Sequence, residues 1–401
     1  MGEGSSVAGG AATPHTAGAP AELGRGIGRP PGGRWVSRKV LIYAIPAAVT
    51  ITWLVAVSAA GLWDRALSHW EAAVTMIFGS FLAGSSPEGG GAVAFPVFTK
   101  VLHTPAEVAR TFSLAIQAVG MTVASLVILL ARRTVELRAV AAAAPLGAVG
   151  LVGGLLAFGD PDTAFWAFTM PAAYAKVTFT ITLAAMSFIM FVMLRAPDKG
   201  ADRVPCWTPR IVAGLALAAL FGGAVSSLTG TGVNVMLFLF IVVMAGLHPR
   251  VGIPTSILTM AAVSVVGFVV LVVLHGDFDL GFTSTGEVAS AGGRPVEPPL
   301  AAGRADLFGL WLAAVPVVVW GAPLGTWVAQ HLRESALIAF VAVLALTEVV
   351  TTALLVDGLR TDLALAVYFG VGCVTAIVGV ALLRRYRRPI LGLPPAESSA
   401  V

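Results

Sequence analysis

The chain has very few charged residues. Asp, Glu, Lys and Arg make up only 11% of its 401 residues, whereas about a quarter is usual in a soluble globular protein. So few charges cannot cover a surface that faces water, which excludes an ordinary soluble fold. Hydrophobic residues make up 57% of the chain, and the mean hydropathy is +0.89. Most side chains must therefore face lipid or one another.

Residues that support enzyme chemistry are also scarce. The two cysteines, Cys206 and Cys373, are too few for a disulfide framework or a cysteine-rich metal site. The six histidines lie outside the centres of the apolar stretches, and no His-x₃-His or carboxylate pair lies within them, which disfavours an intramembrane enzyme. The phosphate-binding pattern Gly-x₄-Gly-Lys-Ser/Thr does not occur, which disfavours nucleotide-driven transport by this chain alone. We expect no cofactor, no metal ion and no catalytic residue.

Long apolar stretches dominate the chain instead. Two of them, 72–102 and 211–247, are interrupted near the middle by clusters of Gly, Ser, Thr or Pro. Eight others have about 20 residues each, enough to cross roughly 30 Å of hydrocarbon. We therefore predict an all-α polytopic membrane protein with about eight full spans and two broken helices. The eight spans are approximately 41–63, 108–131, 139–158, 170–194, 254–275, 307–330, 335–356 and 362–383.

The basic residues predict how the spans are oriented. Lys and Arg are enriched in cytoplasmic loops, and here they gather before the first span, near 132–138, near 195–210 and after the last span. The net charge of +4 thus reflects membrane orientation, and we expect no nucleic-acid partner. We predict a multi-pass protein of the inner (plasma) membrane with both termini in the cytoplasm. The loops alternate sides correctly only if each broken stretch enters and leaves on one side, as a hairpin.

The two hairpins divide the chain into two repeats of opposite orientation, each a hairpin followed by three spans. Inverted repeats with broken helices are typical of secondary transporters, because non-helical backbone inside a membrane is tolerated only where it lines a cavity or is buried in protein. The predicted segments are a disordered cytoplasmic tail (1–39), a first span with its outside loop (40–71), repeat 1 (72–195), a cytoplasmic loop (196–210), repeat 2 (211–357) with an outside loop (276–306), and a last span with its cytoplasmic tail (358–401).

The order of motifs around the breaks resembles the TauE/SafE family of sulfite exporters, over roughly residues 72–383. The first break is followed by Phe95-Pro96 and by a His/Pro turn at His103, and the second by a turn at His248-Pro249. A small-residue segment, 320–325, resembles the family's segment in the span after the second hairpin, and we expect it to pack against another helix. The resemblance implies a membrane permease for sulfite, small organosulfonates and related anions.

The two breaks are the predicted substrate site. The N-terminus of a helix presents unpaired N–H groups and about half a positive charge, so it can hold an oxyanion without Lys or Arg. Nearby hydroxyl groups can add hydrogen bonds to sulfite or sulfonate oxygens. The alternative is that these small residues only allow tight turns and close helix packing. The candidates are Ser85, Ser86, Gly89, Gly90, Gly91, Thr229, Gly230, Thr231, Gly232 and Asn234.

Three polar residues are predicted to lie within the membrane: Glu88, Gln117 and Glu348. An ionised carboxylate there is costly unless it is paired, neutral or functional. Glu88 and Glu348 are therefore candidates for proton coupling. The alternatives are a helix-capping role for Glu88 and, for Glu348, a place near a helix end that reaches the outside surface. For Gln117 we expect an interhelical hydrogen bond.

These features predict a secondary transporter that moves a small anion, sulfite or an organosulfonate. A carboxylate beside an anion site repels its ligand unless it is protonated, which favours proton coupling. The expected partners are the anion and the lipid bilayer, and assembly into a homo-oligomer is left open. An anion channel is the nearest alternative, since hairpins alone do not distinguish it, and an intramembrane enzyme is a more distant one.

Overall fold

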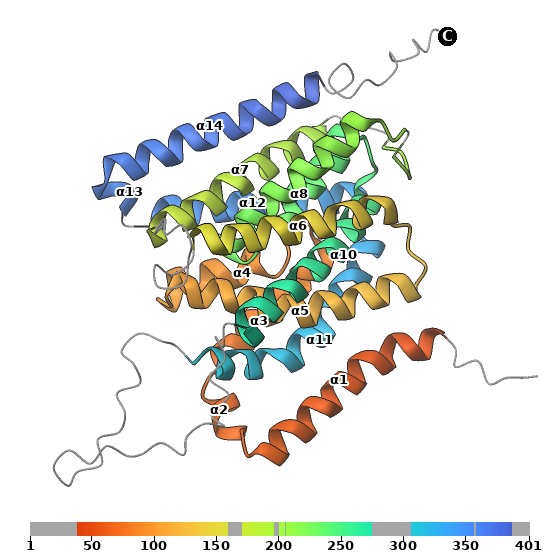
Figure 1. The fold of residues 1–401 in the computed structure, drawn as a ribbon, viewed down its shortest axis with the longest axis vertical. Coiled ribbons are helices and arrows are strands. Elements are labelled where there is room, and N and C mark those ends of the chain that lie inside the picture. Colours follow the sequence, from red (N-terminus) through yellow and green to blue (C-terminus); the bar gives the residue numbers. More distant parts are fainter. Residues whose placement is uncertain are drawn as a thin grey trace, which may run out of the picture. The chain divides into compact units, whose positions relative to one another are not determined.

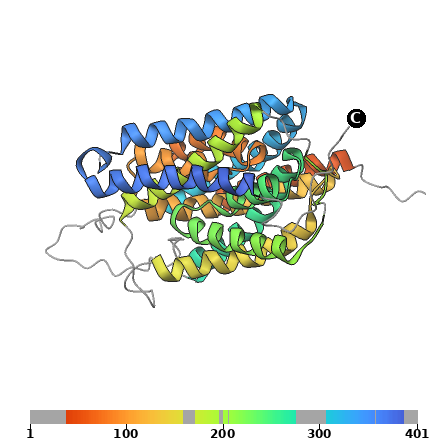
Figure 2. The same ribbon diagram turned by 90° about the horizontal axis from the view of Figure 1, so that it is seen from above.

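The computed structural model describes residues 38–158, 171–195, 200–204, 206–274, 306–356 and 358–386. Apart from turns and one isolated bridge between Ala201 and Leu247, the regular structure in these ranges is helical. The predicted tail (1–39) and the predicted outside loop (276–306) lie almost entirely outside the described residues. The colours in Figure 1 follow the chain, and in Figure 2 most helices lie side by side along a common direction.

Nine helices in the described ranges are long and apolar enough to cross a membrane. Helices are the expected form, because each satisfies its backbone N–H and C=O groups internally where lipid offers no partner. The prediction of an all-α polytopic membrane fold is confirmed. The nine are α1 (Arg38–Ala60), α5 (Ala106–Leu130), α6 (Leu137–Phe158), α7 (Ala172–Arg195), α8 (Pro209–Thr229), α10 (Pro249–Phe268) with its continuation η3 (Val269–Leu274), α11 (Leu307–His331), α12 (Glu334–Leu355) and α14 (Leu363–Arg385).

The first broken stretch forms a hairpin of two short halves. Its first half, α3 (Trp70–Ser85), has 16 residues and ends at a non-helical segment, 86–90. Its second half is α4 (Gly91–Pro96), continued by the π-helical turn η1 (Val97–Val101). Gly89 has a φ of +77°, a left-handed conformation that glycine adopts without strain. Each half is shorter than the roughly 20 residues of a full span.

The second broken stretch has the same plan but a longer first half. α8 has 21 residues, enough to cross a membrane, so the described residues hold nine candidate spans rather than about eight. Helix α8 begins earlier than expected because Pro209 occupies its first turn and the Thr208 side chain accepts a hydrogen bond from the backbone N–H of Ile211. The break, 230–232, is followed by α9 (Val233–Phe238) and the π-helical turn η2 (Leu239–Met244).

The helix contacts of the two predicted repeats form matched pairs. α3 packs against α11, and α8, its counterpart in repeat 2, packs against α6, the counterpart of α11. α5 contacts α11 and α10 contacts α6, while α5 meets α10 and α7 meets α12 across the repeats. Two repeats related by a two-fold axis would produce such pairs. The inverted relation of the repeats stays a prediction that these contacts support.

Small residues bring the matched pairs into backbone contact. A methyl group at Gly84 of α3 would overlap the carbonyl of Ala322 on α11, and one at Gly325 would overlap a backbone carbonyl of α3. Helix α6 approaches α8 equally closely at Gly150. Such close approach between membrane helices depends on small side chains. The expectation that segment 320–325 packs against another helix is confirmed.

The ends of the two hairpins lie near opposite ends of α7. At the end of the first, the Thr99 carbonyl accepts a hydrogen bond (3.2 Å) from the ammonium of Lys176, near the start of α7. At the end of the second, Val243 lines a pocket with Met193, near the end of α7. This placement supports hairpins that enter from opposite sides. Helices α1 and α14, at opposite edges of the bundle in Figure 1, contact mainly α11 and α7 respectively, and short helices α2 (Trp63–Leu67) and α13 (Gly358–Thr361) precede α3 and α14.

Candidate functional site

The two breaks meet inside the helical bundle. The Thr231 hydroxyl donates a hydrogen bond to the backbone carbonyl of Glu88 (3.0 Å), which joins the second break to the first. Gln117, on α5, donates its amide N–H to the backbone carbonyl of Gly230 (2.8 Å), so the predicted interhelical hydrogen bond is confirmed. The side chains here are at most 2% exposed. We call the group formed by Glu88, Gly89, Gln117, Thr231 and Asn234 the break site.

Hydrogen bonds fix the orientation of the Gln117 amide. Its nitrogen lies 2.9 Å from the carbonyl oxygen of Ser113 and 2.8 Å from that of Gly230. Both carbonyls only accept hydrogen bonds, so the NH₂ group must occupy this position. The amide oxygen faces away from them, and no described residue donates to it. A Cβ atom on Gly89 would lie 3.0 Å from this oxygen, so a hydrogen-bond acceptor faces the first break.

The Asn234 amide is fixed in the complementary orientation. Its oxygen accepts a hydrogen bond from the backbone N–H of Gly232 (3.2 Å) and lies 3.1 Å from the Thr231 hydroxyl, whose single hydrogen it shares with the Glu88 carbonyl. The backbone N–H can only donate, so the oxygen is placed correctly and the NH₂ group faces away. No described residue accepts from that NH₂ group. A Cβ atom on Gly89 would lie 2.6 Å from it, so a donor and an acceptor converge on Gly89.

The Glu88 carboxyl group is buried and has no hydrogen-bond partner among the described residues. Its side chain is fully buried, and neither oxygen accepts or donates a hydrogen bond there. Its backbone N–H donates to the Ser86 hydroxyl (3.3 Å), but the carboxyl caps no helix, so the capping alternative is wrong. A buried carboxyl without a partner costs free energy. Glu348 is near enough to interact with it electrostatically.

The other predicted hydroxyls are committed to local hydrogen bonds. Ser85 and Ser86 donate to the carbonyls four residues earlier (2.9 and 3.1 Å), as polar residues often do within helices. Thr229 donates to the carbonyl of Thr231 (2.7 Å). A hydroxyl has a single hydrogen, so these three residues do not offer a donor to the break site in this conformation. The polar atoms of the break site that have no partner among the described residues belong instead to Glu88, Gln117 and Asn234.

The glycines of the two breaks divide into two groups. Gly91 faces the break site, because a Cβ atom on it would lie 2.9 Å from the Thr231 Cβ. Gly90 instead packs against α3, the first half of its own hairpin. A Cβ atom on Gly90 would lie 3.3 Å from the backbone carbonyl oxygen of Gly79. A Cβ atom on Gly232 would likewise lie 2.8 Å from the carbonyl oxygen of Gly222 on α8. Gly90 and Gly232 thus lie in close packing contacts, whereas Gly89 and Gly91 face residues of the break site.

Glu348 forms a buried ion pair with a residue at the end of the first hairpin. Its carboxylate accepts hydrogen bonds from the ammonium of Lys100 (2.5 Å) and from the hydroxyl of Thr352 (3.2 Å). The Lys100 and Glu348 side chains are 4% and 9% exposed, so the alternative that Glu348 reaches the surface is wrong. Sequence reasoning treats Glu348 without its partner, because Lys100 lies 248 positions earlier.

The sequence pattern gives Gln117 a packing role and marks Ser113 only as a residue at the start of a span, with no part in the site. Both lie on the buried face of α5, one turn apart, and the Ser113 hydroxyl has no partner among the described residues. Two polar residues at this spacing in an apolar span are the signal that was available. Among the described residues, no three His, Cys, Asp or Glu side chains lie close enough to share a metal ion.

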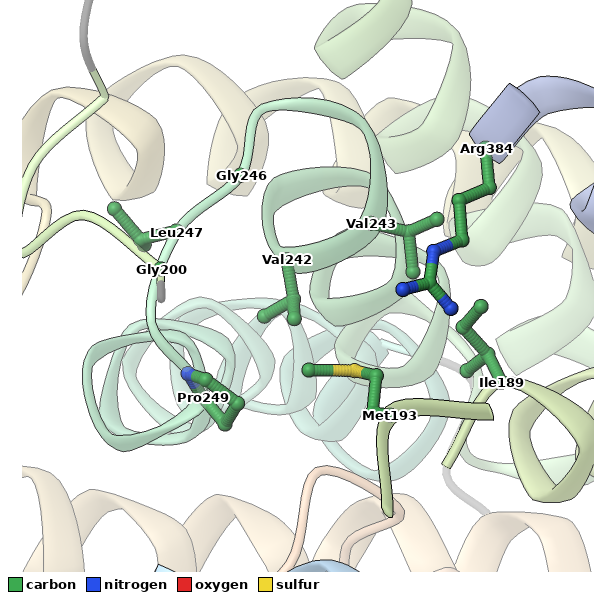
Figure 3. Close-up of a pocket in the computed structure, with 9 residues that line it drawn as sticks. All are labelled: Ile189, Met193, Gly200, Val242, Val243, Gly246, Leu247, Pro249 and Arg384. Atoms are coloured by element: carbon green, nitrogen blue, oxygen red, sulfur yellow. The ribbon is translucent and has the colours of Figure 1, made fainter. Parts of the chain in front are cut away.

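A separate pocket lies at the end of the second hairpin (Figure 3). Its walls come from α7, from the segment that follows η2 and from η2 itself, and the Arg384 guanidinium of α14 points into it beside Val243 and Met193. No residue of the break site lines this pocket. The pocket is mainly apolar apart from Arg384, so its chemistry differs from that of the break site.

The family model for the sulfite exporter TauE/SafE matches residues 72–351, which is more than half of the chain. The chain belongs to the TauE/SafE family. The match begins with the first hairpin and ends near the end of α12, so it contains both breaks. A search of curated proteins and a search of solved structures found no match.

Membership of the TauE/SafE family makes the chain a multi-pass membrane transporter. The apolar helices that carry the match agree with this assignment. The family is one of transporters. At the break site, both hairpins contribute polar groups to one buried point.

Proposed function

We propose that the chain carries a small sulfur oxyanion, sulfite or an organosulfonate, through the break site, and that Glu88 carries a coupled proton. The observation that supports this most directly is the convergence of the Asn234 donor and the Gln117 acceptor on Gly89, beside a buried carboxyl without a partner. Interrupted backbone at membrane depth is typical of the substrate sites of secondary transporters.

The donors of the break site suit the oxygens of an anion. The Asn234 NH₂ group brings two N–H donors, and the second halves of the hairpins, 91–101 and 233–244, both begin beside it. The N-termini of these halves add partial positive charge. An oxyanion with three oxygens can accept hydrogen bonds from several donors at once. A halide ion is a single atom, so it cannot offer a separate acceptor to each N–H of the amide.

The acceptors of the break site suit a proton. The Gln117 oxygen and an ionised Glu88 carboxylate would both repel a fully deprotonated anion. Hydrogen sulfite keeps one O–H and can donate it to Gln117, which an organosulfonate cannot do, whereas a protonated Glu88 can donate to an oxygen of either anion. Binding of hydrogen sulfite together with one proton satisfies both groups. Proton coupling follows if Glu88 releases that proton after the anion leaves.

The variant Glu88→Gln tests coupling in vesicles that contain the purified protein. We expect anion binding to remain, since the amide still offers a donor, and acceleration by a pH gradient to disappear. Glu107→Gln is the matched control, because Glu107 lies exposed on α5 and should leave gradient-driven transport unchanged. Gradient-driven transport by Glu88→Gln at the wild-type level would exclude the coupling role.

Cysteine labelling tests whether the breaks line a passage. Glu88→Cys and Thr231→Cys are introduced singly after replacement of Cys206 and Cys373 by serine. Both positions are buried in this conformation, so we expect a small aqueous thiol reagent to react faster during transport, and bound sulfite to slow the reaction. Complete inertness of both under transport conditions would mean that the breaks only pack.

We further propose that the protein lies in the inner (plasma) membrane with both termini in the cytoplasm, and that 72–195 and 211–357 are inverted repeats. The basic residues beside the spans support the orientation. The matched helix contacts and the placement of the hairpin ends along α7 support the repeats. Labelling of single cysteines at Lys199, between α7 and α8, and at Asp64, before α3, tests the sidedness: only the former should react from the cytoplasm.

A further inference from the structure

We propose that the ammonium of Lys100 and the hydroxyl of Thr352 form a second anion-binding site, which the carboxylate of Glu348 occupies in this conformation. A small oxyanion takes over this site during transport, and Glu348 moves aside. The inference rests on the proposed function only for the identity of the anion. The site lies at the end of the first hairpin, on η1 and α12, apart from the break site.

Glu348 is held as a bound anion would be held. One carboxylate oxygen lies 2.5 Å from the Lys100 ammonium and 3.2 Å from the Thr352 hydroxyl. The other lies 3.4 Å from the hydroxyl of Thr351. Lys100 also donates to the Thr352 hydroxyl (2.7 Å), which has the Glu348 carboxylate (3.2 Å) and the Thr180 hydroxyl (2.7 Å) as neighbours for its one hydrogen. Acetate, sulfite and sulfonates all present two oxygens to such donors.

A second lysine adds positive charge to this site. The Lys176 ammonium donates to the carbonyl of Thr99 (3.2 Å), beside Lys100 in the chain, and forms no ion pair among the described residues. A second ammonium group, without a carboxylate partner among the described residues, thus lies beside the residue that precedes Lys100. Uncompensated charge in an apolar surrounding is costly. An entering anion therefore binds with a more favourable free energy here than beside a pair that is already neutral. Glu88 bonds to neither lysine.

The second anion site lies on the same half-hairpin that starts at the break site. Residues 91–101 form one apolar helical segment, so Lys100 lies roughly 14 Å along its axis from Gly91. The Lys100–Glu348 pair is also the ionic contact that joins this segment to α12. An anion that replaces Glu348 would remove this contact and free the half-hairpin to move. Anion entry and movement of the first hairpin are thereby linked.

Rescue of a truncated side chain tests the second anion site directly. In full-length Glu348→Ala, the space and the donors of the carboxylate remain, so we expect about 10 mM acetate or sulfite to raise the melting temperature by at least about 3 °C. Wild-type protein should shift much less, because Glu348 occupies its site. The double variant Lys100→Met/Glu348→Ala should lose the rescue. Acetate at equal ionic strength is compared with chloride, which lacks paired oxygens.

Each result decides for or against the second anion site. Equal melting temperatures of Glu348→Ala with and without acetate or sulfite would overturn it, as would failure to recover folded Glu348→Ala even when either anion is present throughout purification. Rescue that survives in Lys100→Met/Glu348→Ala would overturn the role of Lys100. Rescue that persists in Asn234→Leu/Glu348→Ala would show that the anion binds at the second anion site and not at the break site. The second anion site is then supported even if the proposed function of the break site fails.

Discussion

Replacement of Gly89 by alanine tests the break site with a single methyl group. Gly89 has a φ of +77°, and the added Cβ would lie 2.6 Å from the Asn234 amide nitrogen and 3.0 Å from the Gln117 amide oxygen. Ordinary carbon contacts are about 3.5–4.0 Å, so the two amides must move apart by roughly 1 Å. A backbone in the left-handed conformation adds a cost of about 1–2 kcal/mol for an L-residue.

A control variant separates these two effects. Gly61 also has a positive φ (+66°), but a Cβ there would meet nothing within 4 Å. Gly61→Ala and Gly89→Ala should therefore lose a similar stability from the backbone, about 1–2 kcal/mol. Only Gly89→Ala displaces the amides. Catalytic groups that are misplaced by about 1 Å slow their reaction strongly, so we expect this shift to lower the transport rate by at least about tenfold.

The assay is uptake of radiolabelled sulfite into vesicles, with thermal unfolding measured on the same preparations. We expect Gly61→Ala to transport at the wild-type rate and Gly89→Ala to bind sulfite more weakly and transport it at least about tenfold more slowly. Wild-type transport by a folded Gly89→Ala protein would refute the reasoning, because it would mean that the Asn234 and Gln117 amides do not contact the anion.

Three further predictions concern the amide, the helix contact and the loop. Gln117→Leu leaves the Gly230 carbonyl without its donor, so unfolding should become about 1–3 kcal/mol easier and sulfite affinity should fall, whereas unchanged affinity would remove Gln117 from the site. Gly84→Val should separate α3 from α11 and destabilise the folded protein by more than about 4 kcal/mol. Gly153→Val should not, because a Cβ atom on Gly153 would have no neighbour within 4 Å. Burial raises the pKa of Asp306, but hydrogen bonds from Arg65 and from the backbone, with the charges of Arg65 and His69, outweigh it and hold the pKa below its usual value. The melting-temperature difference between wild type and Asp306→Asn should therefore be present above about pH 4 and vanish as the pH falls through the lowered pKa; a difference that grows on acidification would contradict this.

The chain alone is enough to predict the spans and the breaks. Length and hydropathy identify the apolar stretches, since about 20 such residues cross a bilayer. The clusters around Gly89 and Gly230 mark the breaks because glycine allows the left-handed backbone that both adopt. The start of α8 is predicted less well, because Thr208 and Pro209 act as local start signals ahead of the apolar run.

The contacts between distant positions could not be predicted in the same way. The Thr231 hydroxyl meets the Glu88 carbonyl across 143 positions, and Lys100 meets Glu348 across 248. Local patterns carry no information on which helix faces which. The hydroxyls of Ser85 and Ser86 illustrate the consequence: their residue type suits an oxyanion, yet their own helix carbonyls take the hydrogen bonds. Gln117 shows the converse, because a helix-packing residue also presents its oxygen to the site.

Flux of radiolabelled sulfite into vesicles that contain the purified protein, with and without an imposed pH gradient, tests the central claim most directly. The proposal predicts flux that accelerates with the gradient, is inhibited by sulfonates and falls sharply in Asn234→Leu. Sulfite flux that follows only its own gradient, whatever the pH difference, would indicate an anion channel. Absence of flux for sulfite and every sulfonate tested, in vesicles where the protein is folded, would contradict the claim that the break site carries a sulfur oxyanion.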